Sequence, residues 1–334
     1  MIPSEIKEKY EIVKLGNSHA EDGLTFEKYK AKSLSLASVA QSFEYDLAML
    51  KMHSHQIKKN AVIVINVSPL SFSQKKAKKQ DESNMNYYDG RLSPFLIPNF
   101  KASEYIQVQI IPFVRTGHIW REKISKDSKE KFMNSFAAEW EKPLKNKPAT
   151  SAATILPEAK EPIIKIRTKD PTFNVQEIQA ELNAPPDLSD ERLVESMHFI
   201  YNKWYKSGDF DPKYFETNRQ DLEKIVAYSL DHNWRPIFIT IPISQVLING
   251  LEKDYLKLYV YDNLGKIDLN GIPYLNFATN SQLTNNKYLF SNSDHLNQKG
   301  AAITSYLLLQ QLIEKGYLPK EVDGYDYSAK MKQF

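Results

Sequence analysis

A serine near the start of the chain and a histidine near its end could together carry out nucleophilic chemistry. Gly16-Asn17-Ser18 follows a short apolar run, and His295 lies in a polar segment just before an amphipathic stretch. A serine hydroxyl is a poor nucleophile until a base takes its proton, and histidine is the commonest such base. The pair therefore predicts attack on a carbonyl, with Ser18 as the nucleophile and His295 as the general base.

Apolar runs of strand length alternate with stretches of helical spacing towards both ends of the chain. The predicted strands are 10–15, 61–67, 237–243 and 272–277, and the predicted helices are 41–59, 222–230, 254–264 and 301–315. The continuously apolar, β-branched run 61–67 is typical of a strand buried on both faces. The alternation predicts an α/β fold, a flavodoxin-like three-layer sandwich with a mostly parallel sheet and a helical insertion.

The predicted sheet places Ser18 at its carboxyl edge, where open α/β sheets bind ligands. Gly16 lets the backbone turn sharply after the first strand, and the backbone N–H of Ser18 then points into the same crevice as an oxyanion donor. Alternatively, Ser18 only caps the helix that follows, since serine is a favoured N-cap. His19 is expected at the helix start, in contact with the substrate or with nothing.

The middle of the chain differs from its ends. Residues 122–147 are charged with helical spacing, and residues 148–186 are rich in Pro, Ala and Thr with little periodicity. We interpret residues from about 74 to 190 as an insertion into a single α/β domain that spans residues 1–334, and not as an independent catalytic domain.

Composition excludes several classes of site. The 334 residues contain no cysteine, which removes disulfides, thiol catalysis and thiolate metal sites. The net charge of +3 is too small to indicate nucleic-acid binding. No apolar stretch approaches the length of a transmembrane helix, and the charged residues soon after Met1 do not resemble a signal peptide. Serine and histidine chemistry needs neither a metal nor another cofactor, so none is expected.

Two segments resemble conserved blocks of the SGNH (GDSL-like) hydrolase superfamily. Leu15-Gly16-Asn17-Ser18-His19 is similar to block I, and Asp294-His295-Leu296-Asn297-Gln298-Lys299-Gly300 is similar to block V. Residues 35–46 resemble a branch that includes the D-alanine-transfer protein of teichoic acid D-alanylation and relatives encoded beside membrane-bound O-acyltransferases. Ile241-Pro242 at a strand end also fits this branch. The resemblance covers the two ends of the chain and not the insertion.

The resemblance implies a serine acyltransferase or esterase acting on a cell-surface glycan or teichoic-acid-like polymer. The substrate would be a surface polymer or an acyl carrier, and the partner a membrane-bound O-acyltransferase. The protein would work at the extracytoplasmic face of the membrane, anchored by an N-terminal segment absent from this chain. Two alternatives remain: a catalytically weak or inactive SGNH-fold binding or scaffold protein beside that acyltransferase, and a cytoplasmic carboxylesterase.

The third catalytic group departs from the family pattern. Block V normally has an aspartate three residues before the histidine, and here that position is Asn292. Replacing the acid of a serine triad by Asn can reduce kcat by about 10⁴. Either Asn292 or Asp294 would orient His295. We expect Asn292 to lie nearer Nδ1, because a residue three positions earlier can fold back under the ring.

The predicted oxyanion donors also depart from the family pattern. The resemblance matches Ala40 to the block II glycine whose N–H enters the oxyanion hole. Block III normally reads Gly-x-Asn-Asp, whereas this chain has Asn66-Val67-Ser68-Pro69. The candidate donors are therefore the N–H groups of Ser18 and Ala40, supplemented by Gln41, Asn66 or Ser68. Asn66 could instead be a turn residue at a strand end.

Overall fold

The computed structural model describes residues 9–26, 32–74, 92–103, 105–106, 175–183, 185, 187, 190–206, 211–267, 271–318, 321–322 and 325–326. The chain divides into two compact units, one of residues 1–99 and 173–334 and the other of residues 100–172. The predicted insertion contains the second unit, and most of it lies outside the described residues, including the charged stretch 122–147. In the second unit the rings of Phe100 and Tyr105 lie 5.6 Å apart.

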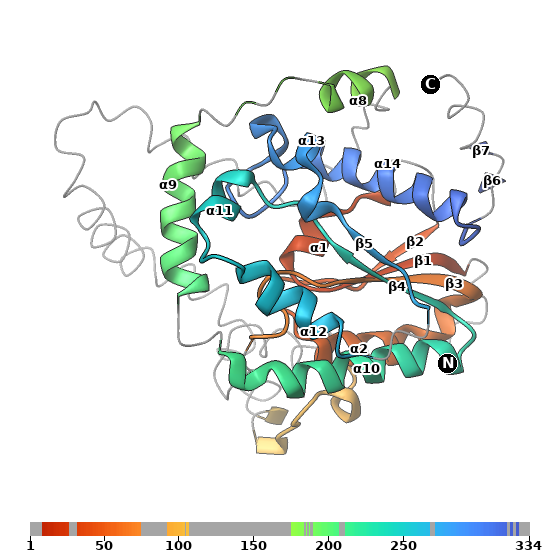
Figure 1. The fold of residues 1–334 in the computed structure, drawn as a ribbon. Coiled ribbons are helices and arrows are strands. Elements are labelled where there is room, and N and C mark those ends of the chain that lie inside the picture. Colours follow the sequence, from red (N-terminus) through yellow and green to blue (C-terminus); the bar gives the residue numbers. More distant parts are fainter. Residues whose placement is uncertain are drawn as a thin grey trace. The chain divides into compact units, whose positions relative to one another are not determined.

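A five-stranded parallel sheet forms the centre of the first unit (Figure 1). Its strands are β1 (Tyr10–Leu15), β2 (Ser33–Ser35), β3 (Ile57–Asn66), β4 (Arg235–Thr240) and β5 (Tyr274–Asn276). Their order is β2-β1-β3-β4-β5, and each neighbouring pair is parallel. This is the strand order of flavodoxin-like folds, and it confirms the predicted α/β three-layer sandwich.

Helices cover both faces of the sheet (Figure 1). On one face α1 (Ser18–Gly23) packs against α14 (Gln298–Glu314), and on the other α2 (Phe43–His53) packs against α10 (Phe215–Asp231). The remaining described helices are α8 (Val175–Leu182), α9 (Glu191–Ile200), α11 (Gln245–Gly250), α12 (Asp262–Leu264) and α13 (Ser281–Thr284).

Shorter elements connect these helices and strands. Single 3₁₀ turns lie at Ser54–Gln56, Pro94–Leu96, Pro212–Tyr214, Phe277–Thr279 and Lys287–Leu289, and β6 (Glu321–Val322) pairs with β7 (Tyr325–Asp326). Two π-helical turns, Tyr201–Tyr205 and Lys257–Tyr261, follow α9 and precede α12. Within the described part of the chain, no helix combines the length and apolar character needed to span a membrane.

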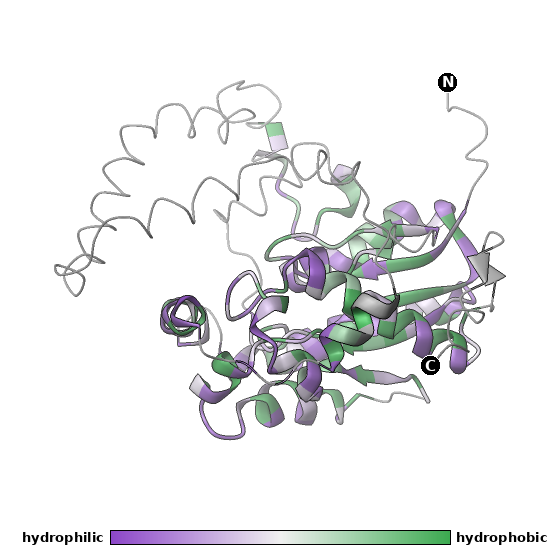
Figure 2. Ribbon diagram, turned by 90° about the horizontal axis from the view of Figure 1, so that it is seen from above, coloured by the Kyte–Doolittle hydropathy of each residue, from purple (hydrophilic) through white to green (hydrophobic). Residues whose placement is uncertain are grey.

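The central strands are apolar throughout because helices bury both of their faces. Ile63, Ile65 and Ile239 are fully buried, and in Figure 2 the hydrophobic colour concentrates inside the unit. A side chain on either face of such a strand leaves water, so neither face selects polar residues. The continuous apolar runs of the sequence follow from this arrangement.

Several element boundaries differ from the predictions. The predicted strand 10–15 is confirmed by β1, whereas the predicted helix 41–59 was wrong at its end, because α2 stops at His53. Ile57 instead begins β3 and pairs with Tyr10, so sheet pairing overrides the helical spacing of the segment. The helix α8 lies in a stretch where the sequence showed little periodicity.

The start of α14 is fixed tightly against the residues that precede it. Asn297 is its N-cap, and its Oδ1 accepts from the N–H groups of Lys299 and Gly300, each at 3.0 Å. The Asn297 N–H donates to the carbonyl oxygen of Leu289 at 2.9 Å. A Cβ built on Gly300 would overlap that carbonyl oxygen and lie 2.8 Å from Leu296 Cδ2. Only glycine therefore fits here.

Replacing Gly300 by alanine should destabilise the protein by about 2 kcal/mol or more, because the added methyl group must push backbone atoms apart. Urea unfolding followed by circular dichroism measures the change. Gly265→Ala is the matched control, since its Cβ would make only ordinary contacts, the nearest at 3.4 Å from the Tyr261 carbonyl oxygen. Equal stability of the two variants would show that this packing does not hold α14.

Candidate functional site

The candidate site lies at the carboxyl ends of β1 and β3, which are neighbours in the sheet. In the sheet, β2 lies on the far side of β1 and β4 lies on the far side of β3, so the strand order runs in opposite directions from this point. Open α/β sheets bind ligands where the strand order reverses in this way. Ser18 follows β1 and Asn66 ends β3, so both predicted residues belong to this edge.

Ser18 is the first residue of α1 and not its cap. Asn17 holds the N-cap position, where its Oδ1 accepts from the His19 N–H at 3.2 Å. The alternative reading of Ser18 as the helix cap is therefore wrong, and its hydroxyl is free of the helix. The turn before it needs Gly16, which has φ of 130° and whose added Cβ would lie 2.9 Å from Asn66 Cβ.

His295 reaches Ser18 from the other end of the chain. Its Nε2 lies 2.8 Å from Ser18 Oγ, which confirms the predicted proximity of the two side chains. Both residues are half-buried, and 277 positions separate them. The distance is that of a hydrogen bond through which an imidazole can take the serine proton.

Helix α9 and the start of α11 hold the loop that carries His295. Ser196 on α9 accepts from the Ser293 N–H at 2.7 Å and donates to Ser293 Oγ at 2.9 Å. Arg192 donates to the carbonyl oxygen of Ser291 at 3.2 Å, and Ser244 Oγ donates to that of Ser293 at 2.8 Å. The sequence did not predict α9, although its contacts set the position of His295.

Two oxygen atoms lie on the Nδ1 side of His295, and neither is close. Asn292 Oδ1 is 3.4 Å from Nδ1 and Asp294 Oδ2 is 3.7 Å from it, so the predicted order is confirmed. Asn292 Oδ1 also accepts from the N–H groups of Asp294 and His295 at 2.9 and 2.8 Å. Asn292 therefore folds under the ring and holds the turn that presents His295.

Asp294 makes its short contacts with other residues. His19 Nε2 and the Tyr205 hydroxyl each lie 2.9 Å from Asp294 Oδ1, in a region where the His19 and Asp294 side chains are 4% and 5% exposed. The expectation that His19 contacts the substrate or nothing was therefore wrong. Burial alone would raise the pKa of Asp294, but His19, His295 and the Tyr205 hydroxyl outweigh it and lower this pKa to about 2.

The two histidines are stacked and their pKa values move in opposite directions. Their ring centroids lie 4.7 Å apart with an interplanar angle of 6°. Burial alone would lower the pKa of His19, but the Asp294 carboxylate outweighs burial, so this pKa is raised. Burial and then the charge of His19 lower the pKa of His295, and Asp294 offsets this only in part.

Two of the predicted oxyanion donors, Ala40 and Gln41, lie just before α2. Ala40 lies in an exposed turn with φ of 55°, a left-handed conformation that favours glycine, as the family pattern has it. The Gln41 side chain makes structural contacts, because its Nε2 donates to the Leu36 carbonyl oxygen at 2.8 Å and to Asp46 Oδ1 at 2.5 Å. Its backbone N–H donates to the carbonyl oxygen of Ser38 at 3.1 Å.

Asn66 and Ser68 contact Asn17. The Asn66 Nδ2 group donates to Asn17 Oδ1 at 3.3 Å, and Asn17 Nδ2 donates to Ser68 Oγ at 2.8 Å. The Ser68 N–H donates to Ser71 Oγ at 2.9 Å. These contacts hold the residue before Ser18 in place. The N–H groups of Ser18 and Ala40 stay predictions as oxyanion donors.

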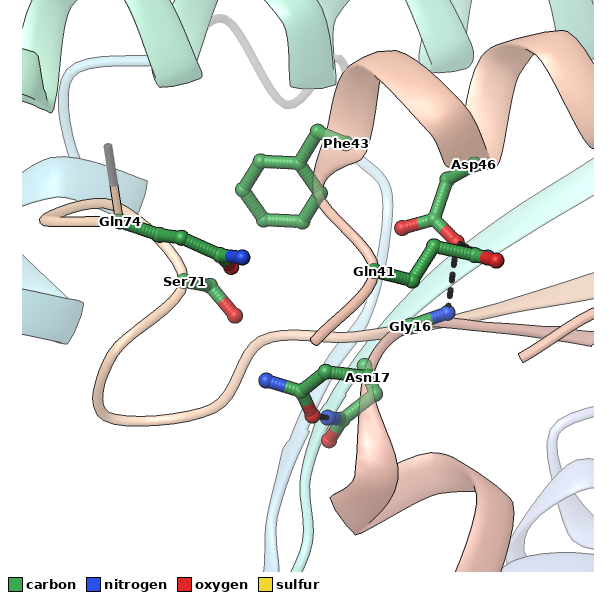
Figure 3. A pocket seen from close by; sticks show the side chains of 8 residues that line it. Gly16, Asn17, Gln41, Phe43, Asp46, Ser71 and Gln74 are labelled. Atoms are coloured by element: carbon green, nitrogen blue, oxygen red, sulfur yellow. Dashed lines mark hydrogen bonds between the residues drawn. The ribbon is translucent and has the colours of Figure 1, made fainter. Parts of the chain in front are cut away.

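A small pocket beside the turn at Gly16 and Asn17 contains a buried acid that the sequence analysis did not identify. Figure 3 shows its lining, which consists of Gly16, Asn17, Gln41, Phe43, Asp46, Asn66, Ser71 and Gln74. Asp46 Oδ1 accepts from the Gly16 N–H at 2.8 Å, and burial raises the pKa of Asp46 to about 7. The signal was its spacing, since Asp46 lies three residues after Phe43 and four before Leu50 on the buried side of α2.

Among the described residues, side chains of types that can bind a metal come together at one place, where they already contact one another. His19, Asp294 and His295 offer ligand atoms within 4.8 Å of one another. A cation here would have to replace the His19–Asp294 hydrogen bond.

No protein-family model and no curated protein matches the chain.

Replacing Asp46 by asparagine should make stability less dependent on pH. The folded pKa of about 7 exceeds the usual value of about 3.9, so between these values the folded state binds more protons than the unfolded state. The free energy of unfolding of the wild type therefore falls as pH rises through this window, by up to about 1.4 kcal/mol per pH unit from this group. An asparagine amide at this position mimics the neutral acid and does not titrate.

Urea unfolding at about pH 4.5 and about pH 7.5 measures the effect. The free energy of unfolding of Asp46→Asn, relative to that of the wild type, should be larger at the higher pH. Asp231→Asn, an exposed acid at the end of α10, is the control for a general loss of negative charge. A difference between Asp46→Asn and wild type that stays constant with pH would contradict the prediction.

Proposed function

We propose that the protein is an SGNH-type serine acyltransferase or esterase. The observation that carries the proposal is the 2.8 Å contact between Ser18 Oγ and His295 Nε2 at the carboxyl edge of a parallel sheet. The fold supports it, because a ligand in the crevice at this edge meets the nucleophile and the base together. The resemblance of residues 15–19 and 294–300 to SGNH blocks I and V supports it independently.

The geometry suits a two-step acyl transfer. Ser18 Oγ attacks the carbonyl carbon of an ester while His295 Nε2 takes the hydroxyl proton, and the N–H groups of Ser18 and Ala40 donate to the oxyanion. The intermediate collapses when His295 returns the proton to the leaving alcohol, which leaves an acyl group on Ser18. Water, or an acceptor hydroxyl, then attacks that ester by the same route in reverse.

The acceptor is proposed from the resemblance of residues 35–46 to the surface-polymer branch. On this basis the substrate is a cell-surface glycan, a teichoic-acid-like polymer or an acyl carrier, handled at the extracytoplasmic face beside a membrane-bound O-acyltransferase. A hydroxyl-bearing polymer would replace water in the second step, which separates a transferase from an esterase without any change in the catalytic residues.

One observation favours a second candidate, a catalytically weak binding or scaffold protein. The Asp294 carboxylate makes its short hydrogen bonds with His19 and Tyr205 and lies 3.7 Å from His295 Nδ1. A serine triad normally uses such a carboxylate to stabilise the imidazolium that forms during attack. With the imidazolium stabilised less well, the site would be better suited to binding a ligand than to fast catalysis.

Replacing Ser18 by alanine should abolish hydrolysis of small activated esters and labelling by a fluorophosphonate probe. The hydroxyl lies outside the helix hydrogen bonds, so its removal should change stability by only about 1 kcal/mol. Ser281→Ala is the matched control, because Ser281 is also the first residue of a short helix with an Asn N-cap. A wild type that neither reacts with the probe nor hydrolyses any ester, yet binds an anionic surface polymer, would favour the scaffold candidate.

Replacing Asn292 by aspartate should raise kcat/KM for a small ester by about tenfold or more, because a carboxylate near Nδ1 stabilises the imidazolium. Both carboxylate oxygens can accept the backbone N–H groups of Asp294 and His295, so the turn should survive. Asn292→Ala, which removes those acceptors, should lower the rate. An aspartate variant that folds and shows an unchanged or lower rate would mean that this position does not limit the chemistry.

A further inference from the structure

His19 has an oxygen acceptor at each of its ring nitrogens. Nδ1 lies 3.3 Å from Asn17 Oδ1, and Nε2 lies 2.9 Å from Asp294 Oδ1. A neutral imidazole carries one N–H, so its other nitrogen would turn a lone pair towards one of these oxygens. An imidazolium donates to both.

The orientation of the Asn17 amide is fixed by other residues, so its oxygen must face His19. Asn17 Oδ1 also accepts from the His19 backbone N–H and from Asn66 Nδ2. On the other side, Asn17 Nδ2 donates to Ser68 Oγ at 2.8 Å. Exchanging the two amide atoms would place an N–H₂ group against the His19 backbone N–H, which can only donate, so the oxygen faces His19.

We propose that His19 is a permanently charged positioning residue, an imidazolium held between Asn17 and Asp294 whose charge keeps the stacked general base His295 neutral. The inference rests on the proposed function, since it assigns His295 the task of accepting the Ser18 proton. Among the described side chains, His19 contacts Asn17, Asp294 and His295, so it acts on Ser18 through His295.

The reason is the short distance between the two rings. At a centroid separation of 4.7 Å, two imidazolium charges in a site screened from water repel each other, so only one ring holds the extra proton. Asp294 contacts His19 at 2.9 Å but His295 at 3.7 Å, so the proton stays on His19. The pKa of His19 is raised and that of His295 is lowered, which agrees with a proton held on His19.

The other titratable groups that face the two rings do not reverse this assignment. The charge of Asp22 on α1 raises the pKa of both histidines, so it does not favour a proton on one ring over the other. Tyr205 belongs to the π-helical turn after α9, and burial and the charge of Asp294 raise its pKa well above the ordinary value. Tyr205 therefore keeps its proton, and its hydroxyl donates a hydrogen bond to Asp294 Oδ1 at 2.9 Å.

An NMR titration of the histidine side chains, with ¹⁵N-labelled imidazole, tests the charge directly. At about pH 7 the wild type should show both His19 nitrogens protonated, while His295 carries one proton. In His19→Gln the midpoint of His295 should rise by about one pH unit or more, because the neighbouring charge is gone while Asp294 remains. His232→Gln, an exposed histidine that contacts Trp234, is the control and should leave the His295 midpoint unchanged.

A His19 with a single protonated nitrogen at about pH 7 would overturn the proposal, as would a His295 midpoint that stays or falls in His19→Gln. If that variant does not fold, Asp294→Asn replaces it. Without the carboxylate, His19 should lose its second proton at a pH at least about one unit lower than in the wild type. An unchanged His19 midpoint in Asp294→Asn would equally overturn the proposal.

The pH profile of ester hydrolysis provides a second readout. The acid limb of kcat/KM reports the protonation of the base, so it should move to higher pH in His19→Gln by the shift seen for His295. Because the wild-type midpoint is lowered below about 6.5, a rise of about one unit should increase the ratio of kcat/KM at about pH 9 to that at about pH 6 by about two- to fivefold over the wild type. A merely structural role would lower the whole profile without shifting it. If the wild type hydrolyses no ester, the proposed function fails, and the NMR titration still decides the charge of His19.

Discussion

The buried carboxylate of Asp294 is the group on which the rest of the site depends. A buried charge without partners is strongly destabilising, and Asp294 receives its partners from two distant parts of the chain. His19 comes from the first helix and Tyr205 from the π-helical turn after α9, and each places a donor 2.9 Å from the same oxygen. A π-helical turn shifts the side chains that follow it, which is how such turns serve functional sites. The contacts that neutralise Asp294 therefore also bring its neighbour His295 over Ser18.

Much of the fold could be predicted from the sequence, because burial on both faces leaves a local signature. The β-branched run in β3 and the apolar run in β4 read as strands without knowledge of their partners. The errors arose where a local pattern fits two structures. Ile57 continues the helical spacing that begins at Phe43, yet it pairs with Tyr10 as the start of β3. Which pattern prevails depends on a strand 47 positions earlier, and no local window contains that information.

The site could be predicted only in part, for a related reason. Ser18 and His295 each follow a recognisable local pattern, and chain order in an α/β fold brings the first strand and the last helix together. The groups that surround them have no such pattern. The spacing of Asp46 places it on the buried side of its helix but does not reveal its partner Gly16, and Tyr205 is one of many tyrosines until the fold places it beside Asp294. Ser68 and Gln41 carry polar groups of the right chemistry, but Ser68 Oγ accepts from Asn17 beside Ser18, and Gln41 Nε2 donates to Asp46 of α2.

The charge balance around His295 explains why the weak contact at Nδ1 matters. In an ordinary serine triad the carboxylate is unpaired with any other cation, so proton transfer to the histidine completes a neutral ion pair. On our proposal, Asp294 is already paired with the His19 imidazolium, and a second imidazolium at a centroid distance of 4.7 Å would leave the three groups with a net positive charge. The negative charge that could balance it is the oxyanion on the substrate itself, or an anionic group that the substrate brings. On our proposal, the site would therefore rely on its oxyanion donors and on the bound acyl substrate more than on a resident acid, which makes the N–H groups of Ser18 and Ala40 as important to the rate as the base.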